Sequence, residues 1–491
     1  MNSMSRRHIL LVNPWVTDFA AYDFWMKPLG LLHLAAQLRH HGEAVRLVDC
    51  MDRSHPALLR WQGLTQPRQQ RWHTGKFVRQ PIAKPALYAG VPRLYARYGL
   101  PPEIFDQLCL AGPRPEVILL TSGMTYWYPG VQQTIAALRR LFPRVPIVLG
   151  GIYATLCPRH AQQTSGADLI VTGEAESVIG DLLKTVALCA AGEYPPIVAG
   201  RATPNLDELP WPAFDLYPRL DYATILTSRG CPLRCTFCAS RIVAGQYRWR
   251  APAAVMAEME WLQRALGVCE FAFYDDALLT NRDRHFLPLC EQIIARRFAA
   301  TFHTPNGLQV KHLDATTAQL MWRAGFRTIR LAYESSSPER WRDMSRKVSN
   351  ESFLRAVTHL QAAGFGPAEL DAYVLMALPG QDLDEVLASM ALVHSLGVGI
   401  RLAAFSPIPG TVDFARAVAR GDLAAEADPL LTNNSILPCR RQGTGFEVYD
   451  HLARLAKLLN AHLRQTGRPL ESAGDLHTRL RRALQEGERV L

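Results

Sequence analysis

The chain has 491 residues, of which 48% are hydrophobic and 20% are charged, and its formal net charge is +10. This composition excludes a disordered chain, and the length exceeds what one hydrophobic core ordinarily serves, so we expect two or three domains. No apolar run is long enough to span a membrane, and the first one has no cleavage site of a secretory signal. We therefore expect a cytoplasmic protein without membrane contact.

Residues 1–198 alternate strand-like and helix-like segments. Short apolar runs, such as HILLVNP and VILLTSG, are separated by stretches with helical spacing, such as VQQTIAALRRLFP. Runs that are apolar throughout indicate a parallel sheet covered by helices on both faces. We therefore predict an α/β fold that begins with a doubly wound, Rossmann-like domain, whose ligand lies beyond the carboxyl ends of the strands.

Two segments interrupt this regularity. Residues 53–114 form an insertion rich in Arg, Pro, Tyr and Trp, and a long irregular insertion in a compact domain is usually functional or mobile, so we expect a lid or a packing collar. Residues 199–222 contain four prolines and are predicted to be a linker. The linker also contains Trp211, Phe214 and Tyr217, which predict that it is packed down rather than free.

A second alternating series occupies residues 223–411. Six strand-like runs, from ATILTS at its start to IRLAAFSP at its end, are separated by helical stretches such as AAVMAEMEWLQRALG. Six strand–helix units predict a partial (β/α)6 barrel of the TIM type, in which the chemistry sits at the carboxyl ends of the strands. Residues 412–491 are mostly helical in pattern, and we expect them to cap the barrel.

Ten cysteines occur in the chain, and seven of them are scattered among mostly apolar neighbours, as buried thiols of a reducing compartment are. The other three, Cys231, Cys235 and Cys238, follow the first strand-like run of the second series. A structural zinc site takes four ligands, and no paired fourth ligand is present. A redox pair leaves the third cysteine unexplained. A cubane cluster has four irons, so three thiolates leave one iron open to a substrate or cofactor. The spacing therefore favours a catalytic iron–sulfur cluster.

The pattern Cys-x-x-x-Cys-x-x-Cys, with Phe237 directly before the last cysteine, resembles the signature of the radical S-adenosylmethionine (radical SAM) enzymes. The resemblance implies a 4Fe-4S cluster held by Cys231, Cys235 and Cys238, with Phe237 packed beside it and S-adenosylmethionine bound at the open iron. In that family one electron from the cluster cleaves S-adenosylmethionine to methionine and a 5′-deoxyadenosyl radical. The radical then abstracts a hydrogen atom from the substrate.

Several polar residues resemble family positions that bind S-adenosylmethionine. Asp275 and Asp276 follow the second strand, where the family binds the methionyl amino group, but the commoner Gly-Gly-Glu form is absent and ordinary helix-start aspartates are the alternative. Glu334, in AYESSS, resembles the glutamate of the family's Gly-x-Glu-Ser version. Arg346 lies where members hold the carboxylate of the cofactor, and Asn306 where the ribose lies. A solvated surface arginine and a turn asparagine are the alternatives for these two residues.

The N-terminal domain resembles the cobalamin-binding domain that precedes the barrel in one subgroup of the family. The resemblance rests on LGGIYAT, VTGEAES, the LDELPWPAFDLY linker and KPLGLLHLAAQLRHHGEAVRLVD. It implies bound cobalamin, with Gly150 and Gly151 beside the nucleotide tail and Ser122 against the corrin. Asp52 and His55 lack the spacing of the cobalt-binding Asp-x-His-x-x-Gly motif. A domain kept only for packing or for substrate recognition is the alternative.

Together these resemblances imply a radical SAM enzyme. With cobalamin bound, the expected reaction is radical methylation of an unreactive carbon, with methylcobalamin as the methyl donor. Without it, a radical rearrangement or cyclisation is the alternative, and an iron–sulfur protein without turnover is an alternative of another class. We expect a small-molecule substrate, which the cationic composition indicates to be anionic, and an electron donor such as flavodoxin or ferredoxin. Without a basic tail or an RNA-binding signature, we do not expect a nucleic-acid partner.

Overall fold

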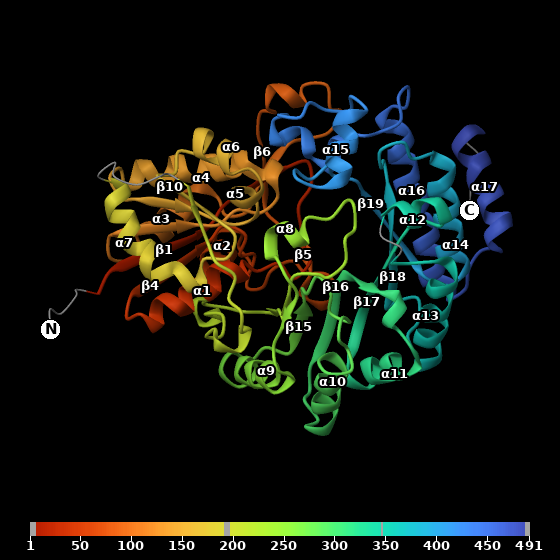
Figure 1. Ribbon diagram of the computed structural model, residues 1–491, viewed down its shortest axis with the longest axis horizontal. Helices are drawn as coiled ribbons and strands as arrows, with labels where there is room; N and C mark the ends of the chain where they lie inside the picture. The colour runs from red at the N-terminus through yellow and green to blue at the C-terminus, as the bar shows by residue number, and fades with distance from the viewer. Residues whose placement is uncertain (1–5, 191–196, 345–346, 487–491) are drawn as a thin grey trace.

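The computed structural model describes residues 6–190, 197–344 and 347–486 (Figure 1). Two parallel sheets of six strands each form its framework, one in the N-terminal domain and one in a partial barrel. This is the α/β architecture that the alternation of apolar runs and helical segments predicts. In Figure 1 the N-terminal domain, coloured red to yellow, lies beside the barrel, coloured green to blue, and α8 (Ser240–Ala244) lies between them.

The N-terminal sheet is built from six parallel strands: β1 (His8–Asn13), β4 (Ala44–Asp49), β8 (Val117–Leu120), β9 (Ile147–Leu149), β10 (Leu169–Thr172) and β11 (Ile197–Ala199). Its helices are α1 (Leu29–His40), α2 (Pro56–Trp61), α3 (Pro102–Leu110), α4 (Tyr128–Leu141), α5 (Ile152–Leu156), α6 (Pro158–Thr164) and α7 (Ile179–Ala190). Successive residues of β1 enter different cores: Leu11 packs under α1 and α7, and Leu10 packs under α3 and α4. The order β11-β10-β9-β8-β1-β4 reverses between β1 and β8.

Strand β11 was not predicted. It is three residues long and reaches the first residue of the predicted linker, so its sequence shows no periodicity that would identify a strand. It pairs in parallel with β10 through Ile170 and Ile197, and thereby extends the sheet by one strand. In the linker beyond it, Phe214 and Tyr217 are buried, whereas Trp211 is 38% exposed.

The barrel sheet contains six parallel strands in chain order: β12 (Ala223–Ile225), β15 (Glu270–Phe273), β16 (Thr301–Gln309), β17 (Phe326–Glu334), β18 (Leu370–Met376) and β19 (Gly399–Ala404). The helices that cover it are α9 (Pro252–Leu266), α10 (Phe286–Ala295), α11 (Ala315–Ala324), α12 (Pro338–Met344), α13 (Asn350–Ala363) and α14 (Leu383–Ser395). In the described part of the chain β12 does not pair with β19, so the barrel stays open on one side.

The inside of the barrel is filled by side chains from the N-terminal domain. The segment after β1 places Trp25 against His303 of β16, with stacked rings 4.2 Å apart, and the Trp25 indole donates a hydrogen bond to the Trp72 carbonyl at 2.7 Å. Phe24 lies beside the guanidinium of Arg330, 4.7 Å from its ring centroid. The two domains therefore share one packed interior.

The insertion at residues 53–114 packs against both domains. Tyr88, Tyr95 and Phe105 are buried in the core under α3 and α4. Arg71 donates hydrogen bonds to the barrel loop before β18. Two small sheets tie the insertion to the segment after β1 through β2 (Val16–Asp18), β3 (Tyr22–Asp23), β5 (Gly75–Lys76), β6 (Arg79–Pro81) and β7 (Ala96–Tyr98).

Three helices follow the barrel: α15 (Val412–Ala419), α16 (Phe446–Thr466) and α17 (Ala473–Glu486). The edge of β19 is closed by Asn460 of α16, whose carboxamide both accepts from the Ile400 N–H at 2.7 Å and donates to the Ile400 carbonyl at 2.8 Å. This contact satisfies backbone groups that an edge strand otherwise leaves open. None of the helices among the described residues is long and apolar enough to cross a membrane.

Candidate active site

The three cysteines of the motif border one cavity. Cys231, Cys235 and Cys238 lie on the loop between β13 (Ser228–Arg229) and α8, and all three line a cavity of about 200 Å³. Among the described residues, no three His, Cys, Asp or Glu side chains converge on a single metal ion. In a cubane each thiolate binds a different iron, so three separate thiols around one cavity fit such a cluster. Burial raises the pKa of Cys231 to about 11, so iron that binds this thiol displaces a proton.

The cysteine loop is held from two sides. The Thr236 hydroxyl donates to Oδ2 of Asp413 at 2.8 Å, and the Asp413 N–H donates to the Thr236 carbonyl at 3.0 Å. The Thr236 N–H donates to the carbonyl of Met344, at the end of α12. Phe237 packs against the apolar cluster that contains Met344 and Phe405. The loop is thus anchored to α12 and α15, while the predicted contact of Phe237 with the cofactor stays a prediction.

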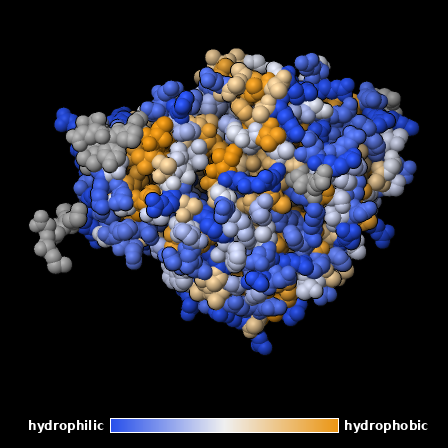
Figure 2. Space-filling model, viewed as in Figure 1, coloured by the Kyte–Doolittle hydropathy of each residue, from blue (hydrophilic) through white to orange (hydrophobic). Residues whose placement is uncertain are grey.

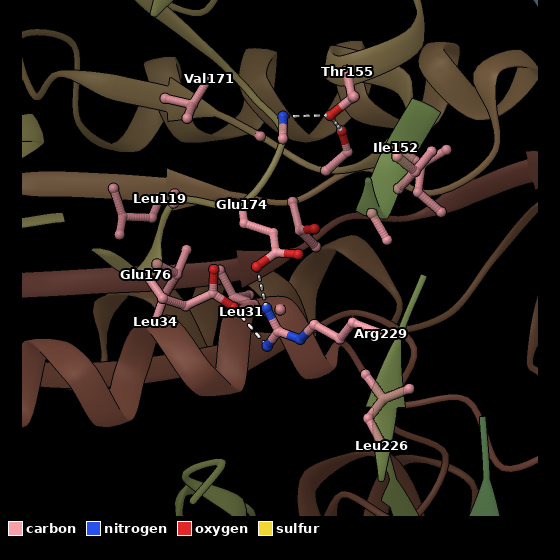
Figure 3. A pocket seen from close by; sticks show the side chains of 18 of the residues that line it. Leu31, Leu34, Leu119, Ile152, Thr155, Val171, Glu174, Glu176, Leu226 and Arg229 are labelled. Atoms are coloured by element: carbon pink, nitrogen blue, oxygen red, sulfur yellow. Dashed lines mark hydrogen bonds and ion pairs between the residues drawn. The ribbon is translucent and has the colours of Figure 1, made fainter. Parts of the chain in front are cut away.

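A second cavity, of about 320 Å³, lies between the N-terminal domain and the barrel (Figure 3), and we call it the interdomain cavity. One wall is the carboxyl-terminal edge of the N-terminal sheet together with α1, and it presents Leu31, Leu119 and Val171. The other wall is the start of the cysteine loop, with Ser228 and Arg229. On the face shown in Figure 2, hydrophobic residues gather where α5 and α8 meet, which are helices that border this cavity.

Bare backbone faces the interdomain cavity at Gly150 and Gly173, where an added Cβ would meet no atom closer than 3.7 Å. Gly151 also lines the cavity; its φ is +93°, and a Cβ there would lie 2.4 Å from the Ser122 carbonyl oxygen, so only glycine fits. The Ser122 hydroxyl donates to the Gly150 carbonyl at 2.6 Å and accepts from the Ala154 N–H at 3.3 Å. Ser122 thus holds the glycine turn. An apolar wall beside open backbone, in a cavity of this size, suits one part of a large ligand such as cobalamin.

A buried ion network joins the two walls. Arg229 lies 3.0 Å from a carboxylate oxygen of Glu174 and 2.8 Å from one of Glu176, and Figure 3 shows it pointing toward both. Arg248 also pairs with Glu174. Burial lowers the pKa of the Arg229 guanidinium, but Glu176 and Glu174 more than offset this and raise it overall. Because Glu174 and Glu176 follow β10 and Arg229 precedes Cys231, the network ties the N-terminal domain to the cysteine loop.

The two adjacent aspartates after β15 have different surroundings. Asp275 is buried, and its carboxylate accepts from the Thr227 N–H at 3.1 Å, the Thr227 hydroxyl at 2.7 Å and the Ser228 hydroxyl at 2.5 Å. Burial raises the pKa of Asp275, and these donors oppose the rise. Asp276 instead lines the interdomain cavity and is exposed there. Partial desolvation by the surrounding residues raises the pKa of its carboxyl group. Asp275 therefore positions the backbone before the cysteines, and Asp276 is placed to meet a ligand.

Glu334 is linked to the cysteine loop by Lys347, a residue that the sequence did not indicate. Its backbone has a φ of +72°, which is a strained conformation for a residue other than glycine and is found preferentially at functional sites. Its carboxylate accepts from Lys347 Nζ at 2.8 Å, and Nζ lies 5.4 Å from the Phe237 ring centroid. Arg346 lies outside the described residues, so its role stays a prediction. In the pair Arg346–Lys347, no signal in the sequence favoured the lysine.

For Asn306, a contact with the ribose was expected after the third barrel strand, and a turn asparagine was the alternative. It lies within β16, which continues to Gln309 through a register shift against β17 between Thr304 and Leu308. Its carboxamide donates to the carbonyls of Tyr274 at 2.8 Å and of Asp275 at 3.2 Å. Asn306 therefore supports the backbone turn that carries the aspartates, and its contact with a ribose stays a prediction.

Asp52 and His55 have structural partners near the carboxyl end of β4. The His55 Nδ1 accepts from the Ala57 N–H at 3.1 Å and caps α2. Oδ1 of Asp52 accepts from the Ser54 N–H at 3.1 Å and lies 3.7 Å from Lys27 Nζ, and burial raises the pKa of Asp52 to about 6. The imidazole is thus committed to a helix cap instead of a metal.

We expect the His55→Ala variant to bind cobalamin as the wild type does, because the imidazole serves the cap of α2. The loss of the cap should cost about 0.5–2 kcal/mol of stability. Electron paramagnetic resonance of the cob(II)alamin-loaded protein should give the same nitrogen hyperfine pattern for both proteins. A protein-derived nitrogen coupling that disappears in the variant would contradict this assignment.

Comparison with known families identifies the superfamily and the two domains. Residues 225–393 match the model of the radical SAM superfamily, and residues 102–183 match the model of the B12 binding domain. The chain is therefore a radical SAM enzyme. It belongs to the radical SAM superfamily, in the subgroup with an N-terminal B12-binding domain, and its cofactors are a 4Fe-4S cluster, S-adenosylmethionine and cobalamin.

Individual relatives are distant. The chain is 24% identical to an uncharacterized methyltransferase of Pyrococcus horikoshii, over 60% of this chain and 68% of that protein. It is 28% identical to the anaerobic magnesium-protoporphyrin IX monomethyl ester cyclase of Synechocystis, over 58% of this chain and only 60% of the cyclase. The solved structure of TsrM, a radical S-adenosylmethionine methyltransferase from Kitasatospora setae, matches with a TM-score of 0.59 at 18% identity, over 84% of this chain and 75% of that chain. The last match shows that the shared fold covers both domains.

Proposed function

We propose that this enzyme is a cobalamin-dependent radical methyltransferase that methylates an unactivated carbon of a small molecule. The observation that carries the proposal is the interdomain cavity. Its lining includes Gly150 and Gly151 of the B12-binding domain together with Ser228 and Arg229, directly before the first cysteine. A cavity shared in this way brings a methyl carrier beside the place where the radical is generated. The Pyrococcus relative and TsrM are both methyltransferases by name, and this supports the same reaction class.

In this proposal the residues of the chain bind the cluster and the cofactors and orient them. When bound, the cluster supplies the electron that cleaves S-adenosylmethionine, and cobalamin carries the methyl group. Cys231, Cys235 and Cys238 hold the cluster. Asp276, open to the interdomain cavity, accepts hydrogen bonds from the amino group of S-adenosylmethionine, and Lys347, held by Glu334, faces its carboxylate. A ferredoxin or flavodoxin as electron donor and a cytoplasmic location belong to the same proposal.

The proposed reaction has a defined stoichiometry that can be measured. Each methylation breaks one C–H bond and forms one C–CH3 bond. One S-adenosylmethionine gives its methyl group and leaves S-adenosylhomocysteine. A second S-adenosylmethionine takes one electron and gives methionine and 5′-deoxyadenosine, which keeps the hydrogen atom of the substrate. A further electron restores the methyl carrier, so two electrons are consumed in each cycle.

The anaerobically reconstituted protein, loaded with hydroxocobalamin and reduced with dithionite, tests this stoichiometry. We expect 5′-deoxyadenosine and S-adenosylhomocysteine to form together, and label from the S-adenosylmethionine methyl group to appear in the cobalamin fraction. Protein without added cobalamin is the control and should give no S-adenosylhomocysteine. Formation of 5′-deoxyadenosine alone, whether or not cobalamin is present, would contradict methylation and favour the cyclisation chemistry named for the Synechocystis relative.

A further inference from the structure

A cavity of about 710 Å³ lies beyond the carboxyl ends of β1 and β8, and we call it the switch-point cavity. Strand β1 pairs with β4 on one side and with β8 on the other, so the strand order reverses at this place. Open α/β sheets bind their ligands outside the carboxyl ends of the strands at such a reversal. Val16, which follows β1, and Tyr126 and Trp127, which follow β8, line the cavity. Its volume is that of a small-molecule site.

Most of the wall of the switch-point cavity lies outside the two regions matched by the family models. Residues 16–26 and the insertion residues Lys76, Phe77 and Arg79 lie before the matched B12-binding region, and Asn434 lies after the matched radical SAM region. The wall of this cavity is therefore formed mostly by residues beyond the two family matches.

The lining is aromatic and cationic. Its rings come from four parts of the chain and are those of Phe19, Tyr22, Phe24, Phe77, Tyr98, Tyr126 and Trp127. The acidic residue of the lining, Asp18, is buried and already accepts from the Trp127 indole at 2.7 Å and from the Asn433 carboxamide at 3.0 Å. Lys76 and Arg79 are exposed at the cavity, and neither forms an ion pair with a carboxylate of the described residues. The side-chain charge that a ligand meets in this cavity is therefore positive.

Phe24 connects the switch-point cavity with the cofactors. It lines the cavity, and its carbonyl accepts from the Tyr274 hydroxyl at 2.5 Å, while Tyr274 itself lines the interdomain cavity. On the barrel side the guanidinium of Arg330 lies against the Phe24 ring. Arg330 is 4% exposed and has no carboxylate partner among the described residues, and its Nε has no hydrogen-bond partner. A third cation without a carboxylate partner thus lies behind the aromatic wall, where it donates a hydrogen bond to the Tyr373 hydroxyl at 3.0 Å.

Resting on the proposed function, we propose that the switch-point cavity binds the substrate, and that the substrate is a planar aromatic compound with a carboxylate, sulfonate or phosphate group. The rings of Phe77, Tyr98 and Trp127 offer faces and edges for stacking with a planar molecule. Lys76 and Arg79 supply charge-assisted hydrogen bonds to its anionic group. The reacting carbon then lies on the side of Phe24 that leads to the interdomain cavity.

Two fluorescent probes test the class of ligand on the reconstituted full-length protein. The first, 1-anilinonaphthalene-8-sulfonate, is a planar aromatic anion, and the second, N-phenyl-1-naphthylamine, has the same rings without the sulfonate. We expect Lys76→Ala/Arg79→Ala to weaken sulfonate binding by about tenfold and to leave binding of the uncharged amine unchanged. The matched control is Arg60→Ala/Lys457→Ala, which removes the same two charges at exposed positions outside the cavity and should bind both probes as the wild type does.

A second variant tests the place of binding. Ala20 lines the cavity at an exposed position, so Ala20→Trp should fill the cavity without disturbing the core and should displace both probes. Unchanged sulfonate affinity in both cavity variants, or equal affinity of the wild type for the two probes, would overturn the proposal. Formation of 5′-deoxyadenosine by the wild type is measured in parallel. Its absence would contradict the proposed function, while the probe titrations still decide whether the cavity selects aromatic anions.

Discussion

The Cys235→Ala variant is expected to lose the iron–sulfur cluster, and its formation of 5′-deoxyadenosine should fall below detection. Cys235 is one of the three thiols that border the 200 Å³ cavity, and the thiolates at Cys231 and Cys238 hold only two irons of a cubane. Without the cluster, no electron reaches the sulfonium of S-adenosylmethionine. The iron and sulfide content, the visible absorption of the reconstituted protein and product formation measure the three consequences.

Cys269→Ala provides the matched control for this variant. Cys269 is exposed and lies between α9 and β15, where its thiol is 3.8 Å from the Gly267 carbonyl, and it is not part of the cysteine cavity. This variant should keep the iron content and activity of the wild type. A Cys235→Ala protein that retained the full iron content and turned over would refute the ligand assignment, and a Cys269→Ala protein without cluster would refute the choice of the three cysteines.

The architecture was predictable because short stretches of sequence show which residues are buried. Neighbouring residues of β1 and of β8 are apolar because they enter two cores on opposite faces of the sheet, and this is what a buried parallel strand requires. The cysteine motif was predictable for a similar reason, since all three cysteine ligands lie on one short loop and within eight residues of sequence. Both signals are confined to short stretches and do not depend on long-range contacts.

The division of roles within the site was not predictable in this way. Asp275 and Asp276 are identical neighbours, yet one carboxylate holds Thr227 and Ser228 and the other faces the interdomain cavity. Their difference arises from the direction in which each side chain leaves the turn after β15. Lys347 likewise becomes a site residue only because α12 brings it back to Glu334.

Asn306 shows how tertiary structure overrides a local preference. The sequence Pro305-Asn306-Gly307 is typical of a turn, and a turn asparagine was the alternative to a ribose contact. In the barrel, β16 passes through these residues with an irregular register, and the Pro305 carbonyl accepts from the Tyr373 hydroxyl at 2.8 Å. An irregularity of this kind accommodates proline within a sheet. Contacts from the neighbouring strand β18 therefore stabilise an extended segment that the isolated sequence does not favour.

The Arg229→Met variant is expected to lower the free energy of unfolding by about 3–5 kcal/mol, because it removes one cation from a buried ion network and leaves the Glu176 carboxylate without its partner, while Glu174 keeps Arg248. The Arg229 side chain is 10% exposed, and those of Glu174 and Glu176 are 10% and 4% exposed. Methionine keeps the length and apolar stem of the side chain, so the variant removes charge and leaves most of the packing. Chemical denaturation measures the stability, and retention of hydroxocobalamin after desalting shows whether the cavity wall is still formed.

Two further variants separate the buried network from ordinary surface charge. Arg39 of α1 pairs with Asp215 of the linker, and these side chains are 36% and 41% exposed, so Arg39→Ala should cost at most about 1 kcal/mol. Adding Glu176→Gln to Arg229→Met removes the carboxylate charge that lost its partner and should restore part of the lost stability. Equal losses for Arg39→Ala and Arg229→Met would show that burial adds nothing to this network. A double variant no more stable than Arg229→Met would show that the loss comes from packing, and the link between the B12-binding domain and the cysteine loop would then be steric instead of ionic.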